Sequence, residues 1–364
     1  MVCRGAMSDA GRMPEPAAGS ASDGAVRPPV TRSAVLAPRQ TLPPLDLARR
    51  PWPGREITAG GVTLHVRETP GAAGARAVYV HGLSGSATNW TDLAGLLAPR
   101  AHGVAVDLPG FGLSRPLEPR RWTPAANADA LAAFLHGAGD GPVHLLGNSL
   151  GGAVALLLAA RHPDLVRTLT LISPAVPDLR PDPRRMSDPR IVLALVPGLG
   201  RRARRALARV GPRERAEQVV ALCFGDPSVA PEHRLVEATE EIVARGRLEW
   251  AGEAFTGATF GMIAGWFRPG AASLWSALRA VTAPTLVVWG DRDRLVAPRH
   301  AARTVRSLRD GRLLMLPGVG HVAQIEAPEA VACAVAGMWD AVEAGHGSRD
   351  GKMDAVTRVD NVES

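Results

Sequence analysis

The feature that most constrains the fold of this chain is a serine placed between a short apolar strand and an apolar helix. Residues 143–146 form an apolar run after a Gly-Pro pair, as expected for a strand buried on both faces. Residues 153–160 are apolar on every side, which is typical of a buried helix. Between them, Ser149 lies in the pattern G-x-S-x-G, whose small residues allow a strained turn that lifts the hydroxyl above the sheet edge. We therefore predict a strand, a sharp turn and a helix, with Ser149 as the candidate nucleophile.

A glycine-rich loop earlier in the chain offers a second part of the same site. Residues 81–86 read His-Gly-Leu-Ser-Gly-Ser and follow a predicted strand at residues 77–80. When a serine stands on such a turn, an oxyanion hole is formed by the N–H of the next residue, here Leu150, and by an N–H from the loop after the third strand, here Leu83. We predict these two residues as the oxyanion hole. The alternative is an ordinary connection between a strand and a helix.

The late part of the chain supplies a candidate base and acid. A serine hydroxyl is a weak nucleophile near neutral pH, so it needs a base, and the base needs an acid that orients it. His321 lies in a glycine-rich turn after the last predicted strand and is the candidate base. Asp293 follows the preceding strand and is the candidate acid, with Asp291 and Asp178 as alternatives. Asp107 opens a Pro-Gly turn, where a carboxylate more often accepts hydrogen bonds from backbone N–H groups than takes part in catalysis.

Composition sets the broad class of the protein. With 364 residues and 46% hydrophobic residues, the chain can bury a large core in one α/β domain with an insertion, or in two domains. The cysteines Cys3, Cys223 and Cys333 are odd in number and far apart, which argues against a disulfide framework and a thiolate metal site. The N-terminus lacks the apolar core of a signal peptide, and no run of about 18 apolar residues is present. We expect a cytoplasmic protein without a membrane span.

The net charge of +7 raises the question of nucleic-acid binding. The densest basic cluster lies at residues 201–209, where five residues are arginine, but aromatic residues are not interleaved with it and no nucleic-acid-binding motif is present. A solvated helix face is the simpler interpretation, with an anion or partner patch as the alternative. We therefore expect a small-molecule substrate and no nucleic acid as partner, and the sequence leaves the oligomeric state unknown.

Composition and periodicity divide the chain into five segments. Residues 1–52 are rich in Pro, Ala, Ser and Arg and are expected to be disordered. Residues 53–174 show alternating strands and helices and form the first part of the core, which residues 284–343 complete. Residues 175–283 contain helical patterns and scattered large apolar residues, which favours a helical cap over the serine turn. Residues 344–364 are expected to be a disordered tail.

Five motifs, taken in order, resemble those of the α/β-hydrolase superfamily over roughly residues 55–343. They are His81-Gly82-Leu83, Asp107-Leu108-Pro109-Gly110-Phe111-Gly112-Leu113-Ser114, Gly147-Asn148-Ser149-Leu150-Gly151-Gly152, Gly290-Asp291-Arg292-Asp293 and Gly320-His321-Val322-Ala323-Gln324-Ile325-Glu326-Ala327-Pro328-Glu329. The resemblance implies an α/β-hydrolase fold, a mostly parallel eight-stranded sheet with helices on both faces and a helical cap between the sixth and seventh strands. Asn148 departs from the family, which often has histidine there. Serine at position 149 disfavours the dehalogenase and epoxide-hydrolase branches, which use aspartate.

The resemblance and the chain order Ser149, Asp293, His321 predict a serine hydrolase. We expect it to cleave an ester or related acyl bond of a small, mainly apolar substrate through an acyl-enzyme intermediate, with no metal and no organic cofactor. C–C bond hydrolases, acyltransferases and cofactor-free perhydrolases use the same scaffold and remain alternatives. A non-catalytic binding protein is a further alternative, which a missing triad member would favour, and none is missing. The sequence leaves the substrate-binding residues unknown.

Overall fold

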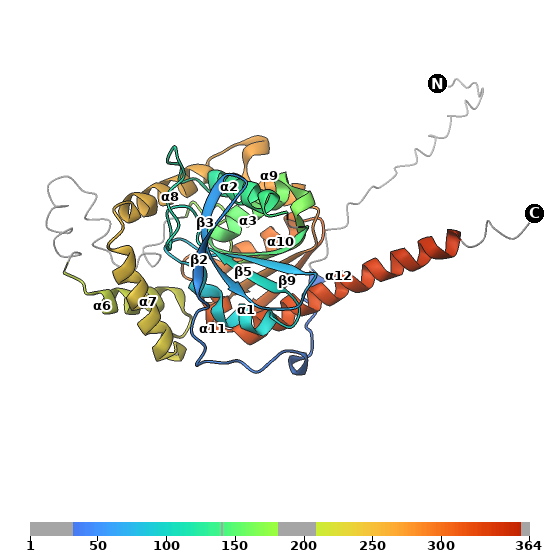
Figure 1. Cartoon of the computed structure of the whole chain (residues 1–364), viewed down its shortest axis with the longest axis horizontal. Helices are drawn as coiled ribbons and strands as arrows, with labels where there is room; N and C mark the ends of the chain where they lie inside the picture. The colour runs from blue at the N-terminus through green and yellow to red at the C-terminus, as the bar shows by residue number, and fades with distance from the viewer. Residues whose placement is uncertain (1–31, 140, 181–208, 358–364) are drawn as a thin grey trace, which may run out of the picture. The chain divides into compact units, whose positions relative to one another are not determined.

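The computed structural model describes residues 32–139, 141–180 and 209–357, which build one sheet with helices on both faces (Figure 1). Within these residues the sheet has nine strands in the order β1-β9-β8-β7-β6-β4-β5-β3-β2. The strands are β1 (Arg32–Ser33), β2 (Gly54–Ala59), β3 (Val62–Thr69), β4 (Arg76–Val80), β5 (His102–Val106), β6 (Val143–Asn148), β7 (Val166–Ile172), β8 (Thr285–Gly290) and β9 (Gly311–Leu316). Neighbouring strands run parallel, except that β3 is antiparallel to both β2 and β5. The predicted mostly parallel sheet is thus confirmed.

Two layers of helices cover the sheet (Figure 1). One layer consists of α2 (Pro124–Gly137), α3 (Leu150–Arg161), α9 (Leu274–Ala280) and α10 (Ala301–Ser307), and the other of α1 (Thr91–Leu97), α11 (Ala323–Glu326) and α12 (Pro328–Thr357). Successive residues of β4 point to opposite faces, so Val78 and Val80 join the core with α2 and α3, while Ala77 and Tyr79 join the core with α1 and α12. Burial on both faces is why the central strands read as unbroken apolar runs.

Two local features of the first part of the core follow directly from the sequence. Strands β2 and β3 pair through a hairpin whose turn residues, Gly60 and Gly61, both have positive φ angles of 56° and 75°. Glycine is favoured there because the turn requires left-handed backbone at both positions. Helix α2 begins at Pro124, and the hydroxyl of Thr123 accepts a hydrogen bond from the N–H of Ala126 at 3.2 Å. The predicted threonine cap with proline in the first helical position is therefore present.

The chain between β7 and β8 contains the helices of the insertion. Among the described residues these are α6 (Pro212–Cys223), α7 (Glu232–Arg245) and α8 (Ala251–Trp266). Helix α9 follows them but packs against α3 and α10, within the helix layer of the sheet, so the boundary predicted at residue 283 differs from the structure. The arginine-rich stretch 201–208 lies outside the described residues, and Arg209 is exposed.

Of the two segments expected to be disordered, residues 32–52 and 344–357 are described and contain regular structure, whereas residues 1–31 and 358–364 lie outside the described residues. Strand β1 pairs with β9 at the sheet edge. With this additional strand the described sheet has nine strands, whereas eight were expected. Ala37 and Leu42 are buried in the core that contains α12, so residues 32–52 pack on the domain. The apolar residues of this segment are few and irregularly spaced, so hydrophobic periodicity could not predict the contact. At the other end, helix α12 continues to Thr357, beyond the predicted end of the core at residue 343.

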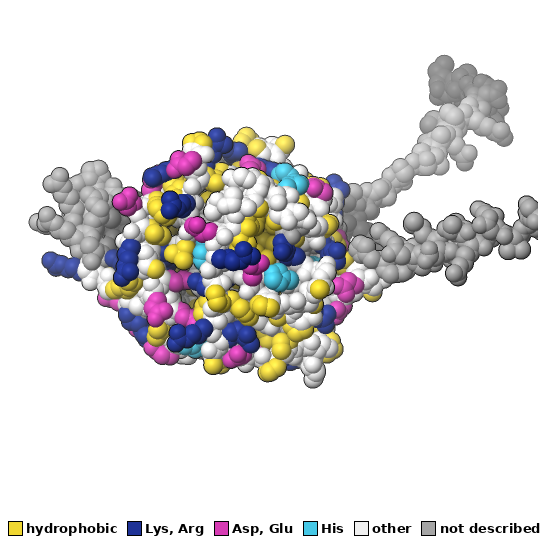
Figure 2. All heavy atoms as spheres, in the orientation of Figure 1, with side chains coloured by type: hydrophobic (Ala, Val, Ile, Leu, Met, Phe, Trp, Pro, Cys, Tyr) yellow, Lys and Arg dark blue, Asp and Glu magenta, His cyan; other side chains and the backbone are white. Residues whose placement is uncertain are grey.

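The surface is mixed in charge on the face shown in Figure 2. Lys and Arg side chains are interspersed there with Asp and Glu side chains and with hydrophobic ones. Among the described helices, none has both the length and the apolar character that a membrane span requires.

Candidate active site

Ser149 occupies a strained turn between β6 and α3. Its φ and ψ angles are 54° and −116°, a backbone conformation that residues other than glycine rarely adopt. The turn is tight: a Cβ atom on Gly147 would lie 2.4 Å from the carbonyl oxygen of Gly151, and one on Gly151 would lie 2.2 Å from that of Val80. Only glycine fits at these two positions. The half-buried serine therefore stands at the end of β6, as the G-x-S-x-G pattern predicts.

His321 and Asp293 meet at the same edge of the sheet. The Nδ1 atom of His321 lies 2.9 Å from Oδ2 of Asp293, and both side chains are buried. The other carboxylate oxygen of Asp293 accepts hydrogen bonds from the backbone N–H groups of Leu295 and Val296, at 2.8 and 2.9 Å. The carboxylate is thus fixed by its own loop and presents one oxygen to the imidazole.

The two alternative acids make other contacts. Asp291 is exposed and accepts a hydrogen bond from the backbone N–H of Gly318 at 2.7 Å. Asp178 accepts hydrogen bonds from Nη2 of Arg299, at 2.6 and 2.7 Å to its two oxygens. The contact with His321 therefore favours Asp293 over the other two candidate acids.

The turn of Ser149 is tied to the turn of His321. Asn148 donates hydrogen bonds from Nδ2 to the carbonyl oxygens of His321, at 3.1 Å, and Ile172, at 3.2 Å. The N–H of Ser149 also donates to Ile172, at 3.0 Å. On its other side, the N–H of His321 donates to the carbonyl of Cys223 at the end of α6, at 2.6 Å. These bonds hold the serine turn, the histidine turn and the insertion together.

Cys223 lies beside this site but is a poor competing nucleophile. Burial raises the pKa of its thiol to about 12, and the nearby charges of Asp293 and Glu326 add to the effect. The thiol is therefore protonated near neutral pH. Because the thiolate is the reactive form of cysteine, Cys223 is unreactive there.

Residues 81–88, which we call the oxyanion loop, connect β4 to the following helical turn. A Cβ atom on Gly82 would lie 3.2 Å from the Cβ of Ser149, so this loop packs directly against the serine turn. His81 accepts a hydrogen bond at Nε2 from the N–H of Leu108, at 3.0 Å, so its proton is on Nδ1, which donates to the carbonyl of Gly82 at 2.7 Å. Burial lowers the pKa of His81 and keeps this neutral form.

The predicted oxyanion-hole donors lie on either side of the serine turn. Leu150 is the first residue of α3, where N–H groups have no partner within the helix, and Leu83 follows Gly82 in the oxyanion loop. In the described part of the chain, neither N–H donates to a protein acceptor.

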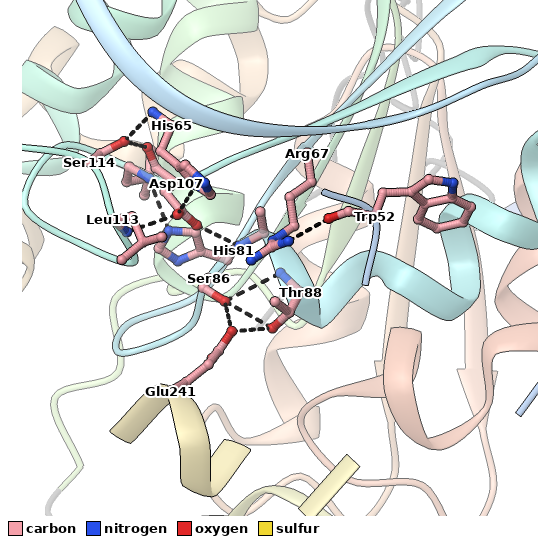
Figure 3. Close-up of polar contacts among 12 residues, drawn as sticks. Trp52, His65, Arg67, His81, Ser86, Thr88, Asp107, Leu113, Ser114 and Glu241 are labelled. Carbon is pink, nitrogen blue, oxygen red and sulfur yellow. Dashed lines mark hydrogen bonds and ion pairs between the residues drawn. The ribbon is translucent and has the colours of Figure 1, made fainter. Parts of the chain in front are cut away.

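Asp107 supports the oxyanion loop from the core, as Figure 3 shows. Its carboxylate accepts hydrogen bonds from the N–H groups of Ala87 and Leu113, at 2.6 and 2.9 Å, and lies 2.7 Å from Nδ1 of His65. Burial alone would raise the pKa of Asp107, but the hydrogen bond to His65 and those from the two backbone N–H groups outweigh it and lower this pKa. The backbone-capping interpretation of Asp107 is therefore supported.

Helix α7 of the insertion contacts the oxyanion loop from the opposite side. Glu241 accepts hydrogen bonds from the hydroxyls of Ser86 and Thr88, at 2.6 and 2.5 Å (Figure 3). Arg245 donates from Nη1 to the carbonyl of Ser84. Sequence reasoning missed both residues, because their spacing of four predicts a shared helix face but not what that face touches.

Sequence reasoning also gave no role to Glu326, which joins the insertion to the turn of His321. Its carboxylate accepts hydrogen bonds from the N–H groups of Gly225 and Asp226, at 3.0 and 3.1 Å, and from that of Gly320, at 2.7 Å. Glu326 belongs to one of the motifs that resemble the superfamily, and its position five residues after His321 is the signal that could have drawn attention to it.

Among the described residues, one group of side chains has metal-ligand spacing, and it is remote from Ser149. The ligand atoms of His136, His162 and Asp164 lie within 4.8 Å of one another. His162 follows the last residue of the 12-residue helix α3, whereas Ser149 precedes the first, which separates them by about 18 Å along the helix. In the part of the chain that the structure describes, no such group includes Ser149, Asp293 or His321.

Known proteins resemble this chain over most of its length. A family model described as alpha/beta hydrolase fold matches residues 78–328. Esterase Rv0045c of Mycobacterium tuberculosis is 29% identical over 279 residues, which are 74% of this chain and 84% of the esterase. The dihydrolipoyllysine-residue acetyltransferase component of the acetoin cleaving system of Pseudomonas putida is 28% identical over 288 residues, 79% of this chain and 69% of that protein. The crystal structure of a membrane phospholipase A, a bacterial virulence factor, matches with a TM-score of 0.64 at 25% identity, and the match covers 80% of this chain and 86% of that one.

Proposed function

This chain belongs to the alpha/beta hydrolase family and is an α/β-fold hydrolase, and from this premise we propose that it is a serine hydrolase acting on an ester or related acyl bond. The observation that carries the proposal is the buried contact between His321 and Asp293, on a turn that Asn148 ties to the turn of Ser149. An imidazole oriented by a buried carboxylate is the kind of base that a serine hydroxyl needs to become reactive, which supports the proposal.

In the proposed mechanism the hydroxyl oxygen of Ser149 attacks the acyl carbon. Because Nδ1 of His321 faces Asp293, Nε2 of the same ring takes the serine proton and then gives it to the leaving alcohol. Asp293 holds the imidazole in the required tautomer and stabilises its protonated form. Water then attacks the acyl-enzyme by the same route, which releases the acid and restores the free serine.

The N–H groups of Leu83 and Leu150 are the proposed donors to the oxyanion of each tetrahedral intermediate. Their freedom from protein acceptors within the described residues supports this role. Loss of one such donor would cost about 3 kcal/mol of transition-state stabilisation. The neutral His81 supports the loop that carries Leu83 by donating a hydrogen bond to the carbonyl of Gly82.

We propose a small, mainly apolar substrate. The indole N–H of Trp266, at the end of α8, donates to the carbonyl of Ala175 at 3.1 Å, and the N–H of Ala175 donates to the carbonyl of Ser149 at 2.9 Å. An aromatic residue of the insertion is therefore linked to the serine turn through one residue. Trp122 and Met262 are likewise partly buried against the same core. These side chains suit an apolar acyl or alcohol group.

Labelling with a fluorophosphonate tests the proposed nucleophile. Wild-type protein should be labelled covalently, and Ser149→Ala should not. Equal labelling of both proteins, or labelling of neither, would contradict the proposal. Retention of the fold in the variant should be checked by circular dichroism and thermal unfolding, because Ser149 sits in a strained turn.

A substrate panel separates hydrolysis from the alternatives. Aryl esters of increasing acyl length and lactones test acyl-bond hydrolysis, and a vinylogous diketone tests C–C bond hydrolysis, each with Ser149→Ala as control. An added alcohol or thiol acceptor tests acyl transfer, which is of interest because one relative is named as an acetyltransferase component. We expect free acid as the main product from the esters. Preferential transfer to the acceptor, or faster cleavage of the diketone, would favour the corresponding alternative.

A further inference from the structure

Helix α7 contacts the core of the protein through a row of polar side chains on one face. Arg234, Glu241 and Arg245 are spaced by seven and four residues, which places them on the same side of the helix. Arg234 pairs with Asp92 of α1, at 3.1 and 2.5 Å. Glu241 and Arg245 instead contact the oxyanion loop itself.

We propose that Glu241 and Arg245 are positioning residues that hold the oxyanion loop in the shape required by the Leu83 donor, so that docking of α7 completes the oxyanion hole. The inference rests on the proposed serine-hydrolase function. It assigns to the insertion a role in transition-state stabilisation.

The backbone of the loop explains why it needs support. Ser84, the residue after Leu83, has a φ angle of 60°, which residues other than glycine rarely adopt. Arg245 donates to the carbonyl of this residue, so the guanidinium binds the backbone immediately after the strained position, one residue beyond Leu83. Arg245 is partly buried, and burial lowers the pKa of its guanidinium, so the contact uses a charge withdrawn from water. Such a contact is costly to break because the guanidinium would lose its carbonyl acceptor.

The other end of the loop is held from two sides. From the core, Asp107 accepts the N–H of Ala87. From the insertion, Glu241 accepts the hydroxyls of Ser86 and Thr88, the residues on either side of Ala87 (Figure 3). Leu83 therefore lies in a segment fixed at one end by His81 and at the other by Asp107 and Glu241, with Arg245 between them.

A purely structural contact between insertion and core is the competing explanation, and Arg234 supplies the matched control. Arg234→Gln breaks the charged pair on the same helix face but leaves the oxyanion loop untouched. If α7 only anchors the insertion, this variant should behave like Glu241→Ala and Arg245→Met. If α7 positions the loop, the three variants should differ in activity.

Kinetics with an aryl ester on the full chain test the proposal. Glu241→Ala and Arg245→Met should lower kcat by about tenfold to a hundredfold, with KM changed by less than about threefold, since the loss concerns a donor used in the transition state. Affinity for a trifluoromethyl ketone, which forms a tetrahedral anion on the serine, should fall in parallel. Glu241→Gln and Arg245→Lys keep an acceptor and a donor and should recover most of the activity. Arg234→Gln should stay within about twofold of wild type.

Amide hydrogen exchange gives a readout that does not depend on catalysis. Exchange in residues 82–88 should rise about tenfold or more in Glu241→Ala and Arg245→Met and remain unchanged in Arg234→Gln. Unchanged exchange in the first two variants, an effect confined to KM, or an equal loss of kcat in Arg234→Gln would overturn the proposal. Raised exchange in a protein whose Ser149 is not labelled by fluorophosphonate would support the loop contact and refute the serine-hydrolase function, so the two failures are distinguishable.

Discussion

The side chain of Asn148 donates a hydrogen bond to the backbone carbonyl of His321 at 3.1 Å. The residue next to the proposed nucleophile thus fixes the main chain of the proposed base. A second bond from the same amide, to Ile172 at 3.2 Å, ties both to the end of β7. The buried side chain of Asn148 thus joins the serine turn, the turn of His321 and the end of β7. The superfamily that this chain resembles often has histidine at this position.

Replacing Asn148 should therefore affect stability and activity together. Asn148→Ala leaves two buried carbonyls without this donor, and we expect it to lower the free energy of unfolding by about 1–3 kcal/mol. The value of kcat should fall by about tenfold because the main chain of His321 is less constrained. Asn148→Asp should be more harmful, since a carboxylate would face both carbonyl oxygens. Urea denaturation and ester kinetics measure both effects. If Asn148→Ala kept wild-type kcat, the tie would be irrelevant to catalysis.

The contact of Asp293 with His321 predicts a large kinetic effect without loss of the fold. Asp293→Asn can present an amide N–H to the imidazole and favour the wrong tautomer, so kcat should fall by roughly 10³ to 10⁴. Asp291→Asn is the matched control, because this carboxylate belongs to the same loop but bonds the N–H of Gly318. We expect the control to change kcat by less than about threefold. Comparable losses in the two variants would argue against Asp293 as the acid.

The serine turn and the contact of Asp293 with His321 could be predicted because each residue lies in the loop or turn that follows a predicted strand. The carboxyl ends of parallel strands meet at one edge of a sheet, so chain order and strand ends are enough to bring these residues near one another. The sequence left Asp291 and Asp178 open as acids, because only coordinates show which carboxylate bonds the imidazole. It also missed β1, a two-residue strand with both side chains exposed, which has no apolar pattern to detect.

The contacts around the oxyanion loop could not be predicted in the same way. Glu241 lies 155 residues from Ser86, and the amphipathic pattern of α7 indicates a helix face without identifying its partner. The carboxylate of Asp107 was correctly interpreted as a backbone cap because its turn chemistry is local. Its contact with His65, 42 residues away, depends on the pairing of β3 with β5. Contacts within one turn could therefore be predicted from the sequence, and polar contacts between residues far apart in the chain could not.

Asp107 should make folding stability depend on pH in the acidic range. Its folded pKa lies below its ordinary value near 4, so the unfolded chain binds the proton more readily. The stabilisation is therefore complete above about pH 5 and is lost as the pH falls through the lower, folded pKa. At pH 7, Asp107→Asn should lower the free energy of unfolding by about 3 kcal/mol, because an amide cannot accept from both N–H groups and His65.

Urea denaturation between about pH 3.5 and pH 7 measures this dependence. The gap between wild type and Asp107→Asn should narrow toward the acid end of the range. Asp129→Asn, which removes an exposed carboxylate paired with Arg161, should change the free energy of unfolding by less than about 1 kcal/mol. A gap that stays constant down to pH 3.5 would mean that Asp107 does not carry the predicted linkage.

Glu326 links the insertion to the turn of His321, so its replacement should reveal how far the base depends on the insertion. Its two oxygens accept three backbone N–H groups, those of Gly225, Asp226 and Gly320. In Glu326→Gln one oxygen becomes an NH₂ group that cannot accept, so we expect a loss of about 1–3 kcal/mol in the free energy of unfolding. Because Gly320 precedes His321, kcat should also fall by about tenfold. Glu329→Gln, which breaks a more exposed pair with Arg39, is the control and should leave kcat unchanged. Equal kinetics in the two variants would show that the insertion does not position His321 through Glu326, leaving Asn148 and Asp293 as its supports.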